Sequence, residues 1–86
     1  MSIKQYDHAG VHHVAACDGA GNLTDGALTA SGWRHVTVLA GCRPYSSIEA
    51  VSMDGVQNLW ASGVQGDLIH CSCDPKSGLW SRDPHP

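Results

Sequence analysis

Short apolar runs separated by turn residues make up most of the chain. Segments 11–17 (VHHVAAC) and 47–53 (SIEAVSM) are apolar runs of strand length, and an Asp-Gly pair follows each one. Asp-Gly favours the positive backbone angles of a two-residue hairpin turn. No long segment carries apolar residues at helical spacing, and ten glycines interrupt the chain. The pattern therefore predicts an all-β chain of short antiparallel strands.

One stretch of sequence occurs twice. DGAGNL at 18–23 returns as DGVQNL at 54–59, which is 36 positions later. Further turns are expected at Asp25-Gly26, at Gly66-Asp67 and over 74–78. The turns divide a single domain, residues 1–86, into an approximate repeat 1 at 11–40 and repeat 2 at 47–80. Each repeat is predicted to be a four-stranded antiparallel meander whose fourth strand opens on a tryptophan, Trp33 or Trp80.

The predicted strands are apolar on both faces. In segment 47–53, Ile48 and Ala50 are assigned to one face, and Val51 and Met53 to the other. Strands of this kind are usually covered on both faces, as in the stacked blades of a β-propeller. We therefore expect two four-stranded antiparallel propeller-like blades, with a ring completed by oligomerisation through the open edges. Only SRDPHP follows Trp80, which is too short for a full fourth strand in repeat 2. The N-terminal SIKQY is a candidate for this missing strand, within the chain or in a neighbour.

Charge and length exclude several classes of protein. The net charge is −3, and Lys and Arg together number only five, which disfavours a partner that is a nucleic acid. No apolar run approaches the roughly 18 residues of a spanning helix, so membrane insertion is not expected. The N-terminus lacks the apolar region of a signal peptide. The expected location is cytoplasmic, or outside the cell after release without a signal peptide.

The four cysteines favour buried thiols over two disulfides, because no secretion signal accompanies them. Cys71 and Cys73 could share a strand face, but the spacing typical of structural zinc sites is absent, so no metal or other cofactor is expected. A Cys-His pair such as Cys71 with His35 has no motif around it. Ser-His-Asp elements also lack motif context, so the chain is expected not to be an enzyme.

Segment 47–80 resembles a blade of the tectonin and tachylectin-type β-propellers. It presents an inner strand, an Asp-Gly turn, a strand with an aromatic residue, a Gly-Asp turn, a strand, and a Gly-containing turn into Trp. Segment 11–40 resembles such a blade more loosely, because Thr24 stands where the second copy has Trp60. The resemblance implies a propeller-blade architecture more strongly than it implies any activity.

The chain is also similar to the fucose-binding bacterial lectins, in which three two-blade chains form a six-bladed ring. CSCDPKSGLW resembles their C-x-D-G-x-G-W stretch, and departs from it at Pro75 and at the inserted Ser77 and Leu79. The resemblance implies glycans as partners, and self-association as a homo-oligomer, most simply a trimer.

The predicted function is carbohydrate binding at aromatic-lined sites between blades. Trp33 and Trp80 are the candidate aromatic surfaces, with packing between blades as the alternative role. Arg34, Glu49 and Arg82 are candidates to hydrogen-bond sugar hydroxyls, with a solvated surface position as the alternative.

Two further assignments complete the sequence-based picture. Trp60 is assigned to packing between blades. The alternative function is a non-catalytic structural or protein–protein interaction module that assembles through blade edges, because a fold alone does not fix a function.

Overall fold

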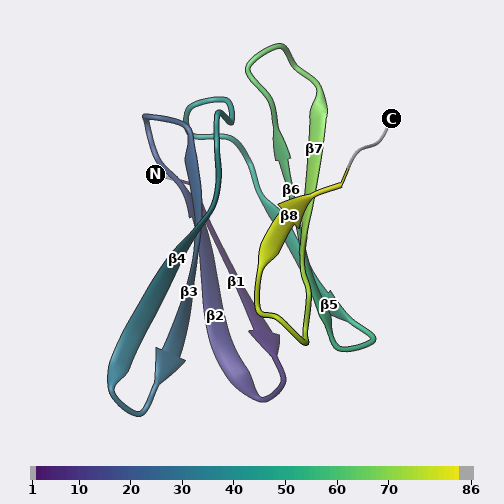
Figure 1. The fold of residues 1–86 in the computed structure, drawn as a ribbon. Coiled ribbons are helices and arrows are strands. Elements are labelled where there is room, and N and C mark those ends of the chain that lie inside the picture. Colours follow the sequence, from purple (N-terminus) through teal and green to yellow (C-terminus); the bar gives the residue numbers. More distant parts are fainter. Residues whose placement is uncertain (1, 84–86) are drawn as a thin grey trace.

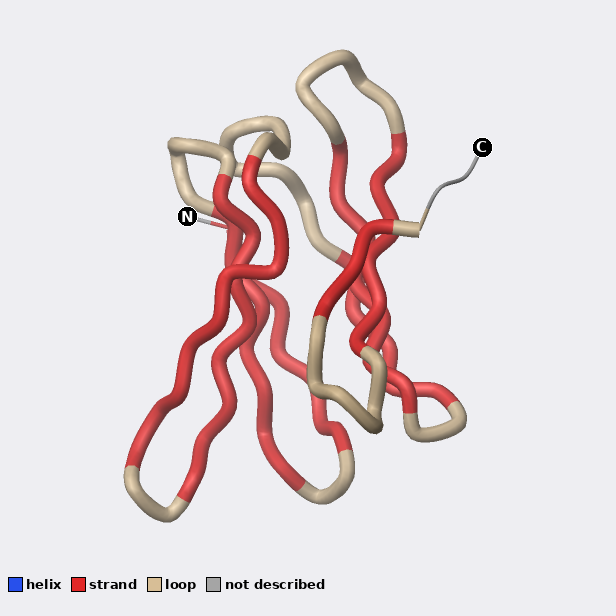
Figure 2. Tube along the Cα trace, viewed as in Figure 1, coloured by secondary structure: helices blue, strands red, loops and turns tan. Residues whose placement is uncertain are grey.

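The computed structural model describes residues 2–83, which form eight strands and no helix. The first sheet consists of β1 (Ser2–His8), β2 (Val11–Cys17), β3 (Asn22–Thr29) and β4 (Gly32–Ala40). The second consists of β5 (Glu49–Met53), β6 (Val56–Ser62), β7 (Leu68–Cys73) and β8 (Trp80–Arg82). Neighbours in sequence pair antiparallel in both sheets (Figures 1 and 2). The predicted all-β fold with two four-stranded antiparallel sheets is confirmed.

The two sheets face each other and enclose one hydrophobic core (Figure 1). Side chains alternate along each strand, so each sheet directs one set of residues inward. The largest fully buried side chains are Leu23, Leu59, Ile69, Cys17, Cys42 and Cys71. The opposite face of each sheet lies outside this core and leaves several large apolar side chains exposed. We refer to these two faces as the first outer face (first sheet) and the second outer face (second sheet).

The two sheets repeat at a spacing of 45 residues. Ala9-Gly10 joins β1 to β2 with φ angles of 51° and 78°, and Asp54-Gly55 joins β5 to β6 with 54° and 77°. The next turn repeats as well: Gly21 N–H donates to the Asp18 carbonyl as Gly66 N–H donates to the Gly63 carbonyl. The 36-residue spacing seen in the sequence is therefore not the structural repeat, because Asp18-Gly19 follows β2 whereas Asp54-Gly55 follows β5.

Two sequence-based predictions are wrong in the first sheet. The expected turn at Asp25-Gly26 does not form, because both residues lie within β3 and pair with β2 and β4. Gly26 instead leaves room for a neighbouring ring, since an added Cβ would lie 2.9 Å from His35 Nδ1. The N-terminal SIKQY does not complete the second sheet; it belongs to β1, which the hairpin turn at Ala9-Gly10 folds back onto β2.

All four cysteines are buried free thiols, as predicted. Burial raises the pKa of Cys42, and it raises the pKa of Cys71 to about 11. The charged form is disfavoured in an apolar environment, so these side chains stay protonated near neutral pH and pack as small apolar groups.

The repeated turn provides a matched pair of substitutions. Gly21 and Gly66 have φ angles of +81° and +84°, but a Cβ at Gly21 would collide with the Cys42 carbonyl oxygen, whereas Gly66 faces open space. We expect Gly66→Ala to lower the free energy of unfolding by about 1–2 kcal/mol, the typical cost of a left-handed Ala. Gly21→Ala should cost more, as measured by urea denaturation. Equal losses would contradict the close packing of this turn against Cys42.

Candidate functional site

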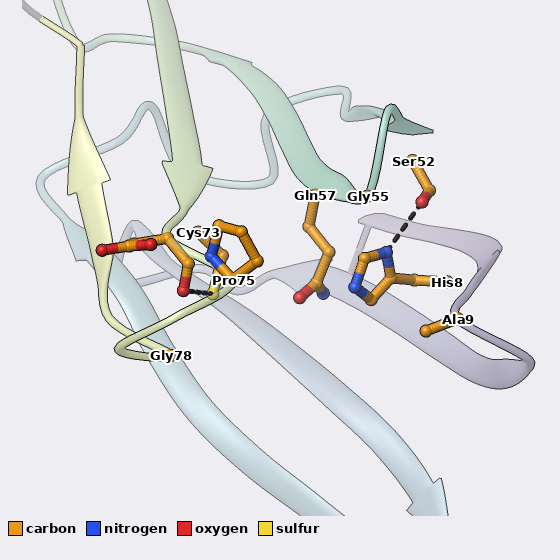
Figure 3. A pocket seen from close by; sticks show the side chains of 9 residues that line it. His8, Ala9, Ser52, Gly55, Gln57, Cys73, Pro75 and Gly78 are labelled. Carbon is orange, nitrogen blue, oxygen red and sulfur yellow. Dashed lines mark hydrogen bonds between the residues drawn. The ribbon is translucent and has the colours of Figure 1, made fainter.

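A cleft of about 570 Å³ opens between the two sheets at one end of the core. Three connections meet there: the β1–β2 turn, the β5–β6 turn and the β7–β8 turn (Figure 3). Its lining consists of His8, Ala9, Ser52, Gly55, Gln57, Cys73, Asp74, Pro75 and Gly78. Polar side chains therefore come from both sheets to one opening, which we call the inter-sheet cleft.

His8 is held in place on one side of the cleft. Its Nδ1 lies 2.7 Å from Ser52 Oγ on β5, and its ring packs edge-on against His13 with 5.7 Å between ring centroids. The contact to Ser52 crosses from one sheet to the other (Figure 3). The ring is fixed through Nδ1, which leaves Nε2 as the ring nitrogen available to a bound molecule.

Gln57 is anchored behind the cleft by a buried polar network. Its Nε2 donates to Tyr6 Oη at 2.8 Å, and Tyr6 Oη donates to Asp25 Oδ1 at 2.6 Å. Asp25 Oδ2 also lies 2.9 Å from His13 Nδ1. Burial, and then the hydrogen bond to Asp25, raise the pKa of Tyr6 far above its usual value, so its hydroxyl remains a donor. The network ties Gln57 of the second sheet to three residues of the first.

The orientation of the Gln57 amide follows from this network. All of its hydrogen bonds to Tyr6, His13 and Asp25 involve Nε2. In Figure 3 the side chain lies between His8 and Pro75, with the amide oxygen on the side of Pro75. The carbonyl oxygen is thereby presented as an acceptor in a fixed direction.

The opposite wall is formed by Cys73 and the turn that follows it. The Asp74 carboxylate accepts hydrogen bonds from Lys76 N at 2.9 Å and from Ser77 Oγ at 3.1 Å, which lower the pKa of Asp74. Burial raises the pKa of Cys73, and the negative charges of Asp25 and Asp74 raise it further. The Asp74 carboxylate is thus held within its own turn, and Cys73 is a buried, protonated thiol.

The two predicted tryptophans occupy equivalent positions but opposite environments. Trp33 pairs with Leu28 at the start of β4, and Trp80 pairs with Cys73 at the start of β8. Trp33 lies on the first outer face and is 46% exposed, whereas Trp80 is half-buried and packs against the core. The structure does not bring them together, and neither lines the inter-sheet cleft.

The predicted charged residues also lie outside the inter-sheet cleft. Glu49 Oε1 lies 3.7 Å from Lys4 Nζ, and Arg82 Nη2 lies 3.2 Å from Asp67 Oδ2. Arg34 is exposed on β4. The ion pairs of Glu49 and Arg82 join exposed side chains, so they contribute little to stability.

Trp60 lies on the second outer face rather than between the sheets. It is half-buried and stacks on His70, with 4.6 Å between ring centroids and an interplanar angle of 8°. Sequence reasoning missed the cleft residues His8, Ser52 and Gln57 because no motif joins them. Ser52 follows His8 by 44 positions, and only the approach of β1 to β5 brings the two together.

The chain matches no family model, no curated protein and no solved structure. Within residues 2–83, no three His, Cys, Asp or Glu side chains gather as metal ligands. Over the same residues, no helix is long and apolar enough to cross a membrane.

Removal of the Gln57 amide tests the network that supports the cleft. Gln57→Leu leaves the buried Tyr6 hydroxyl and Asp25 carboxylate without their donor from the second sheet. We expect the free energy of unfolding to fall by about 1–3 kcal/mol, the cost of unsatisfied buried polar groups. The control Gln65→Leu replaces an exposed glutamine in the turn between β6 and β7, and should change the free energy of unfolding by less than about 0.5 kcal/mol. Similar effects of both substitutions in chemical denaturation would contradict the assigned role.

Proposed function

We propose that this protein binds carbohydrate without catalysis, and that the sugar occupies the inter-sheet cleft. The observation that carries the proposal is the arrangement of His8 and Gln57, which are held rigidly at one opening by partners on the opposite sheet. A cleft of about 570 Å³ is of the size that holds a small ligand. The resemblance of the sequence to propeller lectins supports the same class of ligand.

The polar groups of the cleft suit a neutral polyhydroxylated ligand. Gln57 Oε1 is an acceptor, and His8 Nε2 can donate or accept according to its tautomer. Sugar hydroxyls donate and accept, so each of these groups can engage one. The ring of Pro75 and the methyl group of Ala9 supply apolar surface for the C–H groups of the sugar. Prior fixation of His8 and Gln57 reduces the entropy lost on binding.

The state of Cys73 favours binding over nucleophilic catalysis. A cysteine reacts as the thiolate, and a reactive thiolate needs a lowered pKa. The pKa of Cys73 is raised by burial and by neighbouring carboxylates. This supports a recognition role for the cleft.

A second role, self-association, is favoured by a different observation. Both sheets leave apolar side chains exposed on their outer faces, including Trp33 and Met53. Exposed apolar patches on soluble proteins commonly mark interaction surfaces. We propose that copies of the chain assemble into a closed ring, for which the resemblance to two-blade lectins suggests a trimer. Multiple sites on one ring would bind a glycan-coated surface with avidity.

Sugar binding by the cleft is tested with a substitution that spares the core. A glycan array followed by calorimetry on the best monosaccharide should show that His8→Ala weakens affinity about tenfold, equivalent to about 1.4 kcal/mol. The matched control is His12→Ala, because His12 projects from β2 onto the first outer face. It should leave the affinity unchanged. Binding of no glycan by the wild type would overturn the proposal, as would equal losses from both variants.

A further inference from the structure

The 45-residue repeat exchanges the buried and exposed faces of the two sheets. Ile3 and Ile48 are equivalent, yet Ile3 is 59% exposed and Ile48 is 7% exposed. Trp33 and Trp80, which pair with the equivalent residues Leu28 and Cys73, show the same difference. The first outer face carries Ile3, Val14, Ala16, Leu28 and Trp33. Their equivalents in the second sheet are Ile48, Leu59, Ala61, Cys73 and Trp80. The first four are buried, and Trp80 packs against the core.

The second outer face shows the reverse relation. It carries Val51, Met53, Trp60 and Leu68. The equivalents in the first sheet are Tyr6, His8, Ala15 and Leu23, which face the second sheet. Each outer face is therefore equivalent, by the repeat, to a face of the other sheet that is covered inside the chain.

We infer that a second copy of this chain packs its second outer face onto the first outer face of its neighbour. This inference rests on the self-association proposed above and names its surfaces. The contact would reproduce, between copies, the packing that the first and second sheets have within one chain. Because the two surfaces differ, the contact is head-to-tail, and an open assembly keeps one unused surface of each kind, one at each end, until a ring closes.

The shape of the first outer face fits a partner with protruding side chains. Two adjoining hollows of about 280 and 230 Å³ lie on it, and both are lined by Val14 and His35. Trp33 borders the smaller hollow, and Gly26 leaves space beneath the rings of Trp33 and His35. Large side chains from a facing sheet can enter such hollows.

The distribution of exposed apolar residues supports the same pair of surfaces. Of the ten large hydrophobic residues exposed within residues 2–83, six lie on the two outer faces. These are Ile3, Leu28, Trp33, Val51, Met53 and Leu68. Burial of apolar area of this kind is the main favourable term in protein association.

The surfaces are tested by charged substitutions at exposed leucines. Leu28→Lys changes the first outer face (47% exposed) and Leu68→Lys the second (64% exposed). Leu79→Lys is the matched control, because Leu79 is 70% exposed in the β7–β8 turn, off both faces. In light scattering at micromolar concentration, the wild type and Leu79→Lys should be oligomers. Each face variant should lose the closed assembly and run as a monomer, with circular dichroism unchanged.

Mixing the two face variants distinguishes head-to-tail contact from other arrangements. Each variant retains the surface that the other has lost, so an equimolar mixture should form heterodimers and nothing larger. A mixture that stays monomeric, or a single face variant that still assembles like the wild type, would overturn the named surfaces and leave self-association standing. A monomeric wild type would overturn both the named surfaces and self-association. This holds whether the faces then bind another protein, a glycan or nothing. Sugar binding by the inter-sheet cleft is measured separately and does not depend on this result.

Discussion

Both sheets of this chain carry apolar side chains on two faces, and two sheets can cover each other on only one face apiece. Sheets with two apolar faces are stable when both faces are covered. Within the chain, the inward faces are satisfied by a core around Leu23, Leu59 and Ile69. The outward faces leave Trp33 and Leu68 exposed. The fold, the cleft between the sheets and the proposed assembly all follow from this unequal coverage.

Much of the fold could be predicted from local sequence signals. The Asp54-Gly55 turn and the tryptophan at the start of each fourth strand are present as expected, and residues 2–83 contain no helix. The Asp25-Gly26 turn was wrong because the same dipeptide can serve within a strand, where Gly26 gives space to a ring from the next strand. The Ala9-Gly10 turn was missed because alanine rarely adopts a positive φ, so β1 was not placed beside β2.

The candidate site could not be predicted from the sequence for a different reason. His8, Ser52 and Gln57 meet only because β1 lies beside β5, and no spacing in the sequence encodes that contact. The tryptophans were expected to form two equivalent sites, but Trp33 lies on the first outer face, whereas Trp80 packs against the core between the sheets. The cleft is also unique within the repeat, because Met53 stands where the second sheet would need an equivalent of His8. We therefore expect one sugar per chain rather than two.

Coverage of the first outer face by a second copy would change the fluorescence of Trp33, which is 46% exposed within one chain. In a chain carrying Trp60→Phe and Trp80→Phe, Trp33 is the only emitter, since the sequence contains three tryptophans. Assembly through this face predicts blue-shifted emission and protection from acrylamide quenching at micromolar concentration, with a shift to the red and loss of protection on dilution to low nanomolar concentration. Emission that remains red-shifted and fully quenchable at every concentration would show that this face stays in water and that the chain does not assemble through it.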